Sequence, residues 1–229
     1  RYLAFSLGIL FWISILYLAN FPELQTVSQT GWEKTVTWLD GTKETIQITD
    51  KGQVILNGEY IKPFGFCGLC WLDMADAEFE NIMNWFDQKG VRFFETAFLT
   101  TYFDNQKFMM DKYFPKLKAH KKFVRLGIIN PTPTQYDFDA DFWETGFKTL
   151  IDYIDSKGWG DMMISVQITH EIEHRAMRTG KTVQQLKDFL DTMNQRAKAK
   201  LATKTWGNIP VIHAEDGITK DWETDKPYH

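Results

Sequence analysis

Residues 75–94 read ADAEFENIMNWFDQKGVRFF, and this stretch decides the fold class. Its apolar residues recur at the spacing of one helix face: Phe79, Ile82, Met83 and Phe86. We therefore expect an amphipathic helix over 75–88, ended by Lys89-Gly90. A strand begins at once with Val91–Phe94. A helix that feeds directly into an apolar strand is typical of a βαβ unit.

The same alternation of strands and helices runs from Pro63 to Ala214. Strands are expected at 64–66, 91–94, 123–129, 162–169 and 210–214. Helices are expected at 75–88, 104–120, 141–157 and 182–203. Pro115 should break the second of these helices, because proline cannot donate a backbone hydrogen bond. Strands joined by long helical crossovers pair in parallel.

The pattern predicts an α/β fold with a TIM-barrel-like (β/α)8 domain over residues 63–229. The alternation supplies about five βα units, fewer than a closed barrel needs. A doubly wound sheet is the alternative architecture. No glycine-rich phosphate fingerprint follows the first strand, which disfavours that alternative.

Three shorter segments precede the barrel-like domain. Residues 33–62 are expected to form a β-meander or hairpin region, because Asp40-Gly41 and Asn57-Gly58 are tight-turn dipeptides between strand-like runs. Residues 21–32 should be a linker, and residues 1–20 a transmembrane anchor.

The anchor prediction rests on the run from Tyr2 to Ala19, which has no charged residue. As a helix it would span roughly 27 Å, close to the thickness of the bilayer hydrocarbon. A cleaved secretory signal is the alternative, although Leu18-Ala19-Asn20-Phe21 is a poor cleavage site. Arg1 favours a single-pass protein whose domain lies on the extracytoplasmic side of the membrane. Membrane lipid and other membrane-protein subunits are then the expected partners.

Composition narrows the functional classes. The net charge is −4, so no basic footprint for nucleic acid is present. The chain has nine Trp and eighteen Phe, which suit a core and platforms for sugars or proteins. Its two cysteines, Cys67 and Cys70, could be free thiols, a local disulfide or a redox pair, and we favour free or locally bridged thiols without a catalytic role. No cofactor is expected.

Candidate chemistry lies where the strands end, because the βα loops of parallel sheets converge there. The residues at the expected strand ends are Cys67, Cys70, Trp71, Glu95, Thr96, Asn130, His170, Glu171, His213, Glu215 and Asp216. Carboxylates, imidazoles and an aromatic ring therefore gather at one predicted edge.

Three motifs resemble (β/α)8 glycoside hydrolases of the cellulase and mannanase type. Residues 54–66 are similar to the Asn-Gly hairpin that precedes the first barrel strand of that family. Lys89-Gly90-Val91-Arg92 is similar to its second unit, which carries an arginine of the active site. Residues 165–171, SVQITHE, resemble its fourth strand, which ends in Asn-Glu. The resemblance covers residues 52–216.

The resemblance implies that Glu171 is the catalytic proton donor, with a pKa raised by partial burial. It further implies that Arg92 and Trp71 contact a β-linked glycan. His170 stands where the family places an asparagine that contacts a sugar hydroxyl, and His213 is a further candidate for substrate binding. The family's nucleophilic carboxylate comes from a seventh strand, which these residues do not include.

Three explanations of the missing carboxylate stay open. The alternatives are that the chain is one piece of a longer enzyme, that it completes a barrel with another chain, or that it is a non-catalytic accessory subunit of a membrane complex.

A metallopeptidase is the second functional class. Residues 170–174 match His-Glu-x-x-His, in which His170 and His174 would bind zinc and Glu171 would activate water. The third ligand would be His213 or Glu215. The motif needs a helix, whereas the preceding residues read as a strand. The plain structural alternative for His170, Glu171 and His174 is a solvated, charged loop after a core strand. For Arg92 it is a structural ion pair.

Overall fold

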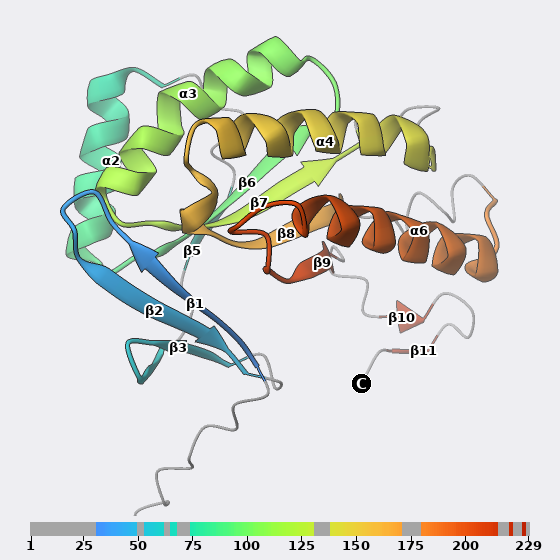
Figure 1. Ribbon diagram of the computed structural model, residues 1–229, viewed down its shortest axis with the longest axis horizontal. Helices are drawn as coiled ribbons and strands as arrows, with labels where there is room; N and C mark the ends of the chain where they lie inside the picture. Colours follow the sequence, from blue (N-terminus) through green and yellow to red (C-terminus); the bar gives the residue numbers. More distant parts are fainter. Residues whose placement is uncertain are drawn as a thin grey trace, which may run out of the picture.

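The computed structural model describes residues 31–49, 53–61, 65–67, 74–130, 138–170, 180–214, 220–221 and 226–227. It describes the backbone alone at 65–67, 170, 183, 213–214, 220–221 and 226–227. Figure 1 shows a small antiparallel sheet beside a larger layer of strands and helices.

The larger sheet is parallel, as the sequence predicts. Its strands are β5 (Gly65–Cys67), β6 (Phe93–Leu99), β7 (Phe123–Ile129), β8 (Met163–His170) and β9 (Val211–Ala214). They lie in sequence order, and each pairs in parallel with the next. A doubly wound sheet reverses its strand order part-way, so this topology contradicts that alternative.

The long helices of the described residues lie along one side of this sheet (Figure 1). They are α2 (Asp76–Gln88), α3 (Phe103–Ala119), α4 (Ala140–Ser156) and α6 (Val183–Leu201). A 3-10 turn, η2 (Gly160–Met162), precedes β8. Right-handed crossovers between strands in sequence order place every helix on the same face. We call the other face of the sheet the open face.

The sequence predicts a barrel-like domain with about five βα units, and the described part of the chain forms a parallel sheet that does not close into a barrel. The parallel sheet has two ends there, at β5 and at β9, and these two strands do not pair. The topology is that of successive βα units, and the closed (β/α)8 form is the feature that the described residues lack.

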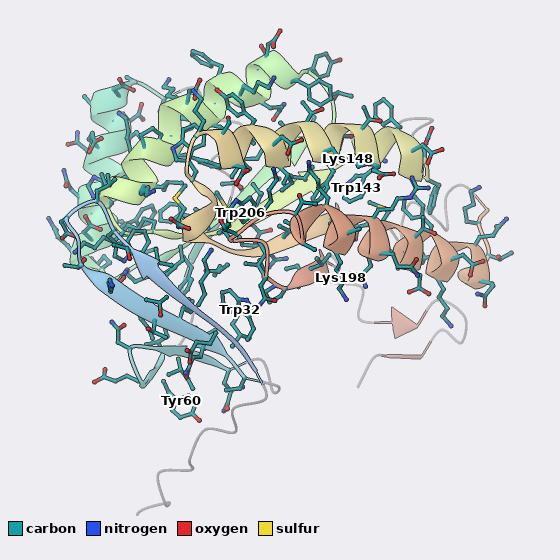
Figure 2. All side chains as sticks on the ribbon, in the orientation of Figure 1. Trp32, Tyr60, Trp143, Lys148, Lys198 and Trp206 are labelled. Atoms are coloured by element: carbon teal, nitrogen blue, oxygen red, sulfur yellow. The ribbon has the colours of Figure 1, made fainter. Side chains whose placement is uncertain are left out.

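The main core lies between the helices and the sheet. Alternate residues of β6, Phe94, Thr96 and Phe98, are buried against the helices, whereas the residues between them are partly exposed on the open face. Trp143 of α4 is fully buried, and Figure 2 shows it beneath that helix. Its indole Nε1 donates to the carbonyl oxygen of Ile128 at 2.9 Å, so the ring fixes α4 on β7.

The break predicted near Pro115 is wrong, because α3 continues through this residue to Ala119. Met110, Phe114 and Leu117 lie on both sides of the proline and are almost completely buried. Proline in a helix costs about 3 kcal/mol. Burial of several large side chains offsets a cost of that size, since each contributes about 1.5–3 kcal/mol.

The antiparallel sheet consists of β1 (Trp32–Thr37), β2 (Lys43–Ile48), β3 (Val54–Leu56) and β4 (Glu59–Ile61), in that order. Gly41 follows Asp40 between the first two strands, and Asn57-Gly58 joins the last two, as the turn dipeptides predict. Two short strands, β10 (Lys220–Asp221) and β11 (Lys226–Pro227), pair near the end of the chain.

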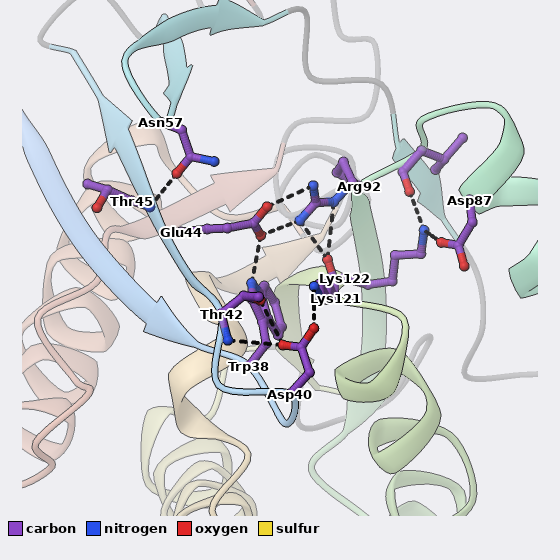
Figure 3. Close-up of polar contacts among 11 residues, drawn as sticks. Trp38, Asp40, Thr42, Glu44, Thr45, Asn57, Asp87, Arg92, Lys121 and Lys122 are labelled. Carbon is purple, nitrogen blue, oxygen red and sulfur yellow. Dashed lines mark hydrogen bonds and ion pairs between the residues drawn. The ribbon is translucent and has the colours of Figure 1, made fainter.

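The antiparallel sheet covers one edge of the parallel sheet, the edge at which β6, β7 and β8 begin. We call it the amino edge, and the edge where the strands end the carboxyl edge. Figure 3 shows Glu44 reaching Arg92 and Asp40 reaching Lys121. The Trp38 ring meets Phe123 edge to face, with 5.2 Å between centroids. The small sheet therefore closes the amino edge.

The predicted membrane span from Tyr2 to Ala19 and the linker at 21–32 fall almost wholly outside the described residues, which begin at Gly31. Among the residues that are described, no helix combines the length and the apolar character needed to cross a bilayer.

Candidate functional site

The carboxyl edge gathers polar residues from neighbouring strands. Thr100 follows the last residue of β6, and Asn130 follows the last residue of β7. The Thr100 hydroxyl donates to Asn130 Oδ1 at 2.7 Å, and both side chains are buried. The predicted place of Asn130 at a strand end is confirmed. The pair ties the ends of two neighbouring strands together without using any charge.

Helix α4 supports this pair through a close approach at Gly146. A Cβ atom at Gly146 would lie 2.8 Å from both the Cα and the carbonyl oxygen of Thr100, and nearer still to its Cβ. Only glycine lets the helix pack this tightly on the end of β6. The position of Thr100 is therefore fixed from the helix side as well as from Asn130.

The loop after β6 continues with Thr101 and Tyr102. The Thr101 hydroxyl is buried and has no hydrogen-bond partner among the residues that the structure describes. Tyr102 is 73% exposed, more than any other large apolar or aromatic residue in the described ranges. The loop thus combines an unpaired polar atom with an uncovered aromatic ring.

A second polar group lies on the open face of the sheet. Glu95, Arg125 and Gln167 come from β6, β7 and β8. Arg125 Nη2 donates to Gln167 Oε1 at 2.9 Å, and Arg125 Nη1 lies 3.5 Å from Glu95 Oε2. Gln167 Nε2 donates to the carbonyl oxygen of Thr169 at 2.9 Å. A polar line therefore runs from the middle of the sheet towards the carboxyl edge.

Arg125 is incompletely satisfied in this line. Its Nε atom is buried and makes no hydrogen bond within the described ranges. The Glu95 carboxylate approaches Nη1 at an ion-pair distance that exceeds an ordinary hydrogen bond. A guanidinium whose Nε has no partner among the described residues, on the face opposite α2, α3, α4 and α6, suits a polar or anionic ligand.

Glu95 lies deeper in the sheet than the sequence indicated. The predicted strand 91–94 would have left Glu95 at its end, but β6 runs on to Leu99 and contains Glu95 as an inner residue. Glu95 pairs in register with Arg125, which pairs with Ser165, five residues before the end of β8 at His170. At about 3.3 Å per residue, Glu95 lies about 16 Å below that end.

This depth bears on catalysis. The two carboxyl groups of a glycosidase lie about 5–9.5 Å apart. Side chains in a sheet stand roughly perpendicular to their strands, so they do little to close a gap along the strand. Glu95 is therefore too deep to serve as the second carboxylate for a catalytic group at the end of β8.

Arg92 does not occupy the place expected beside a substrate. It precedes the first residue of β6 and lies at the amino edge. Its Nη1 donates to Glu44 Oε1 at 3.1 Å, its Nη2 also pairs with that carboxylate, and Nη2 donates to the carbonyl oxygen of Lys121 at 3.0 Å. The alternative, a structural ion pair, describes this arrangement.

The other predicted site residues are described in part or not at all. His170 is the last residue of β8, and His213 lies in the neighbouring β9, where its backbone pairs with Thr169. Both backbones thus reach the carboxyl edge, as predicted. Glu171, His174 and Trp71 lie outside the described residues, and so do Cys70, Glu215 and Asp216.

The zinc-peptidase alternative finds no support in this geometry. His-Glu-x-x-His binds zinc from a helix that contains both histidines, whereas His170 is the end of a strand. In the part of the chain that the structure describes, no group of three His, Cys, Asp or Glu residues could hold a metal ion.

Sequence reasoning missed Thr100, Tyr102, Arg125 and Gln167. A signal for two of them exists, because Arg125 and Gln167 are polar residues that interrupt apolar runs inside central strands. Such residues are expected to point away from the helix-covered face.

No protein-family model matches the chain, and no curated protein matches it. Among solved structures it is similar to a β-glucuronidase of Bacteroides uniformis, with 16% identity and a TM-score of 0.44. A calcium-binding mutant of β-glucuronidase 2 from the same organism gives 15% identity and a TM-score of 0.46. In both cases the match covers 76% of this chain and 23% of the other. The relation is distant, and it assigns neither activity nor substrate.

Proposed function

We propose that the chain is part of a glycoside-hydrolase-like domain that cleaves β-linked glycan, with Glu171 as the proton donor. The observation that carries the proposal is the course of β8. This strand runs in the interior of the parallel sheet and ends at His170, one residue before Glu171 in the sequence. On this proposal Glu171 belongs to the carboxyl edge, at which parallel α/β enzymes hold their catalytic groups.

The surroundings described at that edge suit a sugar. Hydroxyl and amide groups at Thr100 and Asn130 lie at the neighbouring strand ends, and the polar line of Arg125 and Gln167 approaches from below. Sugar recognition needs polar groups that fix hydroxyls together with an apolar surface. The second carboxylate that hydrolysis requires has to be a residue other than Glu95.

The test is hydrolysis of cellohexaose and mannohexaose by the full-length protein and by its Glu171→Gln variant. Loss of a general acid lowers turnover by about 100- to 10,000-fold. Product formation is followed by chromatography, with Glu173→Gln as the matched control, because it removes an acidic group two residues away. Equal turnover in Glu171→Gln and the parent would contradict the assignment, and so would equal losses in the two variants.

A further inference from the structure

Tyr102 adopts a backbone conformation that its surroundings do not explain. It is the N-cap residue of α3, with φ 54° and ψ 46°, in the left-handed region. N-cap residues usually have extended backbone and a side chain that accepts a hydrogen bond from the first turn. Tyr102 has neither property. A bulky residue is strained in this region because its Cβ crowds the backbone.

The other two left-handed residues that are not glycine have clear structural roles. Asn57 lies in the Asn-Gly turn between β3 and β4, and its Oδ1 accepts a hydrogen bond from the amide of Thr45 at 2.9 Å. Asparagine followed by glycine is the favoured pair for such a turn.

Lys121 is the residue after the C-cap of α3. Its amide donates to the carbonyl oxygen of Lys118 at 3.2 Å, and the amide of Lys122 donates to that of Leu117 at 2.9 Å. This pair of bonds is the common way to end a helix with a left-handed residue. The strain at Lys121 is thus offset by satisfied backbone groups.

The left-handed backbone of Tyr102 has no such role in a turn or a helix end, and its side chain is 73% exposed. The residue before it, Thr101, keeps a buried hydroxyl without a partner in the described part of the chain. The loop is therefore both strained and incompletely hydrogen-bonded. Strain that the fold does not need is characteristic of residues kept for binding.

From these observations we propose that Tyr102 is an aromatic platform that stacks on a pyranose ring of the glycan at the carboxyl edge. The inference rests on the proposed function and adds a substrate-binding residue to it. An exposed ring offers a flat apolar face to the C–H side of a sugar. The adjacent Thr100–Asn130 pair holds the end of the strand that presents the ring.

The decisive variant is Tyr102→Gly, because stability and binding should change in opposite directions. Glycine accepts the left-handed backbone, so the Tm should rise by about 2–4 °C. Loss of the ring should weaken binding of cellohexaose or mannohexaose about tenfold. Binding is measured by titration calorimetry in the full-length protein carrying Glu171→Gln, which prevents turnover.

Two further variants separate stacking from other roles. Tyr102→Phe keeps the ring and should bind as tightly as the parent. Phe108→Ala removes another exposed ring, 59% exposed on the same helix, and should leave binding unchanged. Phe108 lies about 9 Å further along the helix axis and has ordinary helical backbone.

Several results would overturn the inference. Unchanged binding in Tyr102→Gly would exclude stacking, and a fall in both Tm and affinity would make Tyr102 a structural residue. Loss of binding in Tyr102→Phe would move the interaction to the hydroxyl. Altered self-association with unchanged glycan binding would make the ring a protein contact. If the unmodified protein neither binds nor cleaves either hexaose, the proposed function itself fails.

Discussion

The two edges of the parallel sheet are built from different chemistry. The amino edge is closed by charged pairs between the small sheet and the strand starts, such as Arg92 with Glu44 and Lys121 with Asp40. The carboxyl edge carries neutral hydroxyl and amide groups, together with the exposed ring of Tyr102. Among the described residues, the amino edge is held by charged pairs, whereas the carboxyl edge is held by a neutral pair and exposes an aromatic face.

The difference indicates how the molecule divides stability and function. At the amino edge, Asp40 accepts hydrogen bonds from Lys121 and Thr42, which lower the pKa of its carboxyl to about 2. At the carboxyl edge, the Thr101 hydroxyl stays without a partner among the described residues. Satisfied polar groups favour a fixed structure, whereas unsatisfied groups cost stability and are kept where binding needs them. Substitutions at the two edges should therefore have different consequences.

The largest effect on stability is expected from Asp87→Asn. Lys122 is fully buried and bonds to Asp87 and to the carbonyl oxygen of Val91. Burial lowers the pKa of Lys122, and Asp87 opposes that change. Without the carboxylate a buried ammonium loses its counter-charge, so we expect a loss of about 3–4 kcal/mol in urea denaturation, with kcat/KM unchanged.

Asp111→Asn is the matched control for that experiment, since Asp111 pairs with Lys157 where both side chains are exposed. It should cost at most about 1 kcal/mol. Equal losses in the two variants would mean that burial of the Lys122 ammonium adds nothing to the strength of its pair with Asp87.

The next effect concerns pH and Lys34, whose Nζ donates to the carbonyl oxygens of Gly160 at 2.9 Å and Met163 at 3.1 Å. Burial lowers its pKa from 10.5 to about 8, and Asp161 raises it in part. Between these two values the unfolded chain binds more protons than the folded one. The free energy of unfolding should therefore rise with pH across this window, by about 2–3 kcal/mol.

Urea denaturation at several pH values between 8 and 10.5 measures this rise. In Lys34→Met the rise should be smaller by the same amount, because the methionine side chain keeps much of the volume and does not titrate. Parallel profiles for the two proteins would show that the Lys34 ammonium is solvated after all.

The smallest effect on stability is expected from Gly146→Ala, which should also lower activity. Alanine in a helix interior normally stabilises by about 0.5–1 kcal/mol. Here the new Cβ would overlap Thr100, and overpacking costs about 1–3 kcal/mol. We expect a net loss of about 1 kcal/mol and reduced hydrolysis of the hexaoses, because the Thr100–Asn130 pair is displaced.

Lys148→Ala on the exposed side of α4, labelled in Figure 2, is the control for Gly146→Ala. It removes one pair with Glu144, worth at most about 0.5 kcal/mol, and should leave hydrolysis intact. Full activity in Gly146→Ala would show that the position of the Thr100–Asn130 pair does not matter for hydrolysis.

Much of the fold could be read from the sequence, because hydrophobic periodicity determines which elements form. The strand 123–129 has the predicted bounds, and the four long helices, β8 and β9 begin and end within two residues of prediction. The exceptions are tertiary effects. Pro115 stays inside α3 because neighbouring side chains are buried, and β6 extends past Phe94 because Glu95 meets Arg125 on the next strand.

The candidate site was harder to predict, for a physical reason. Arg92 and Arg125 are both arginines in or next to a strand. Only the strand register places Arg92 at the amino edge and Arg125 on the open face of the sheet. The left-handed backbone of Tyr102 has no signature in a single sequence, since tyrosine is not a residue that favours it. The membrane span, the proton donor Glu171 and the predicted partners stay predictions.

The order of the contacts at the amino edge has a consequence for folding. The hydrogen bond from Trp32 to Asn208 spans 176 residues, and the one from Lys34 to Gly160 spans 126. The small antiparallel sheet is synthesised before the parallel sheet, yet its binding surface is complete only after β8 and the residues before β9 have emerged. Long loops must close before such contacts form, so docking of the small sheet should be a late and slow step. Docking of the small sheet is therefore a marker of complete folding, because β1 and β2 reach their final contacts only when most of the parallel sheet has formed.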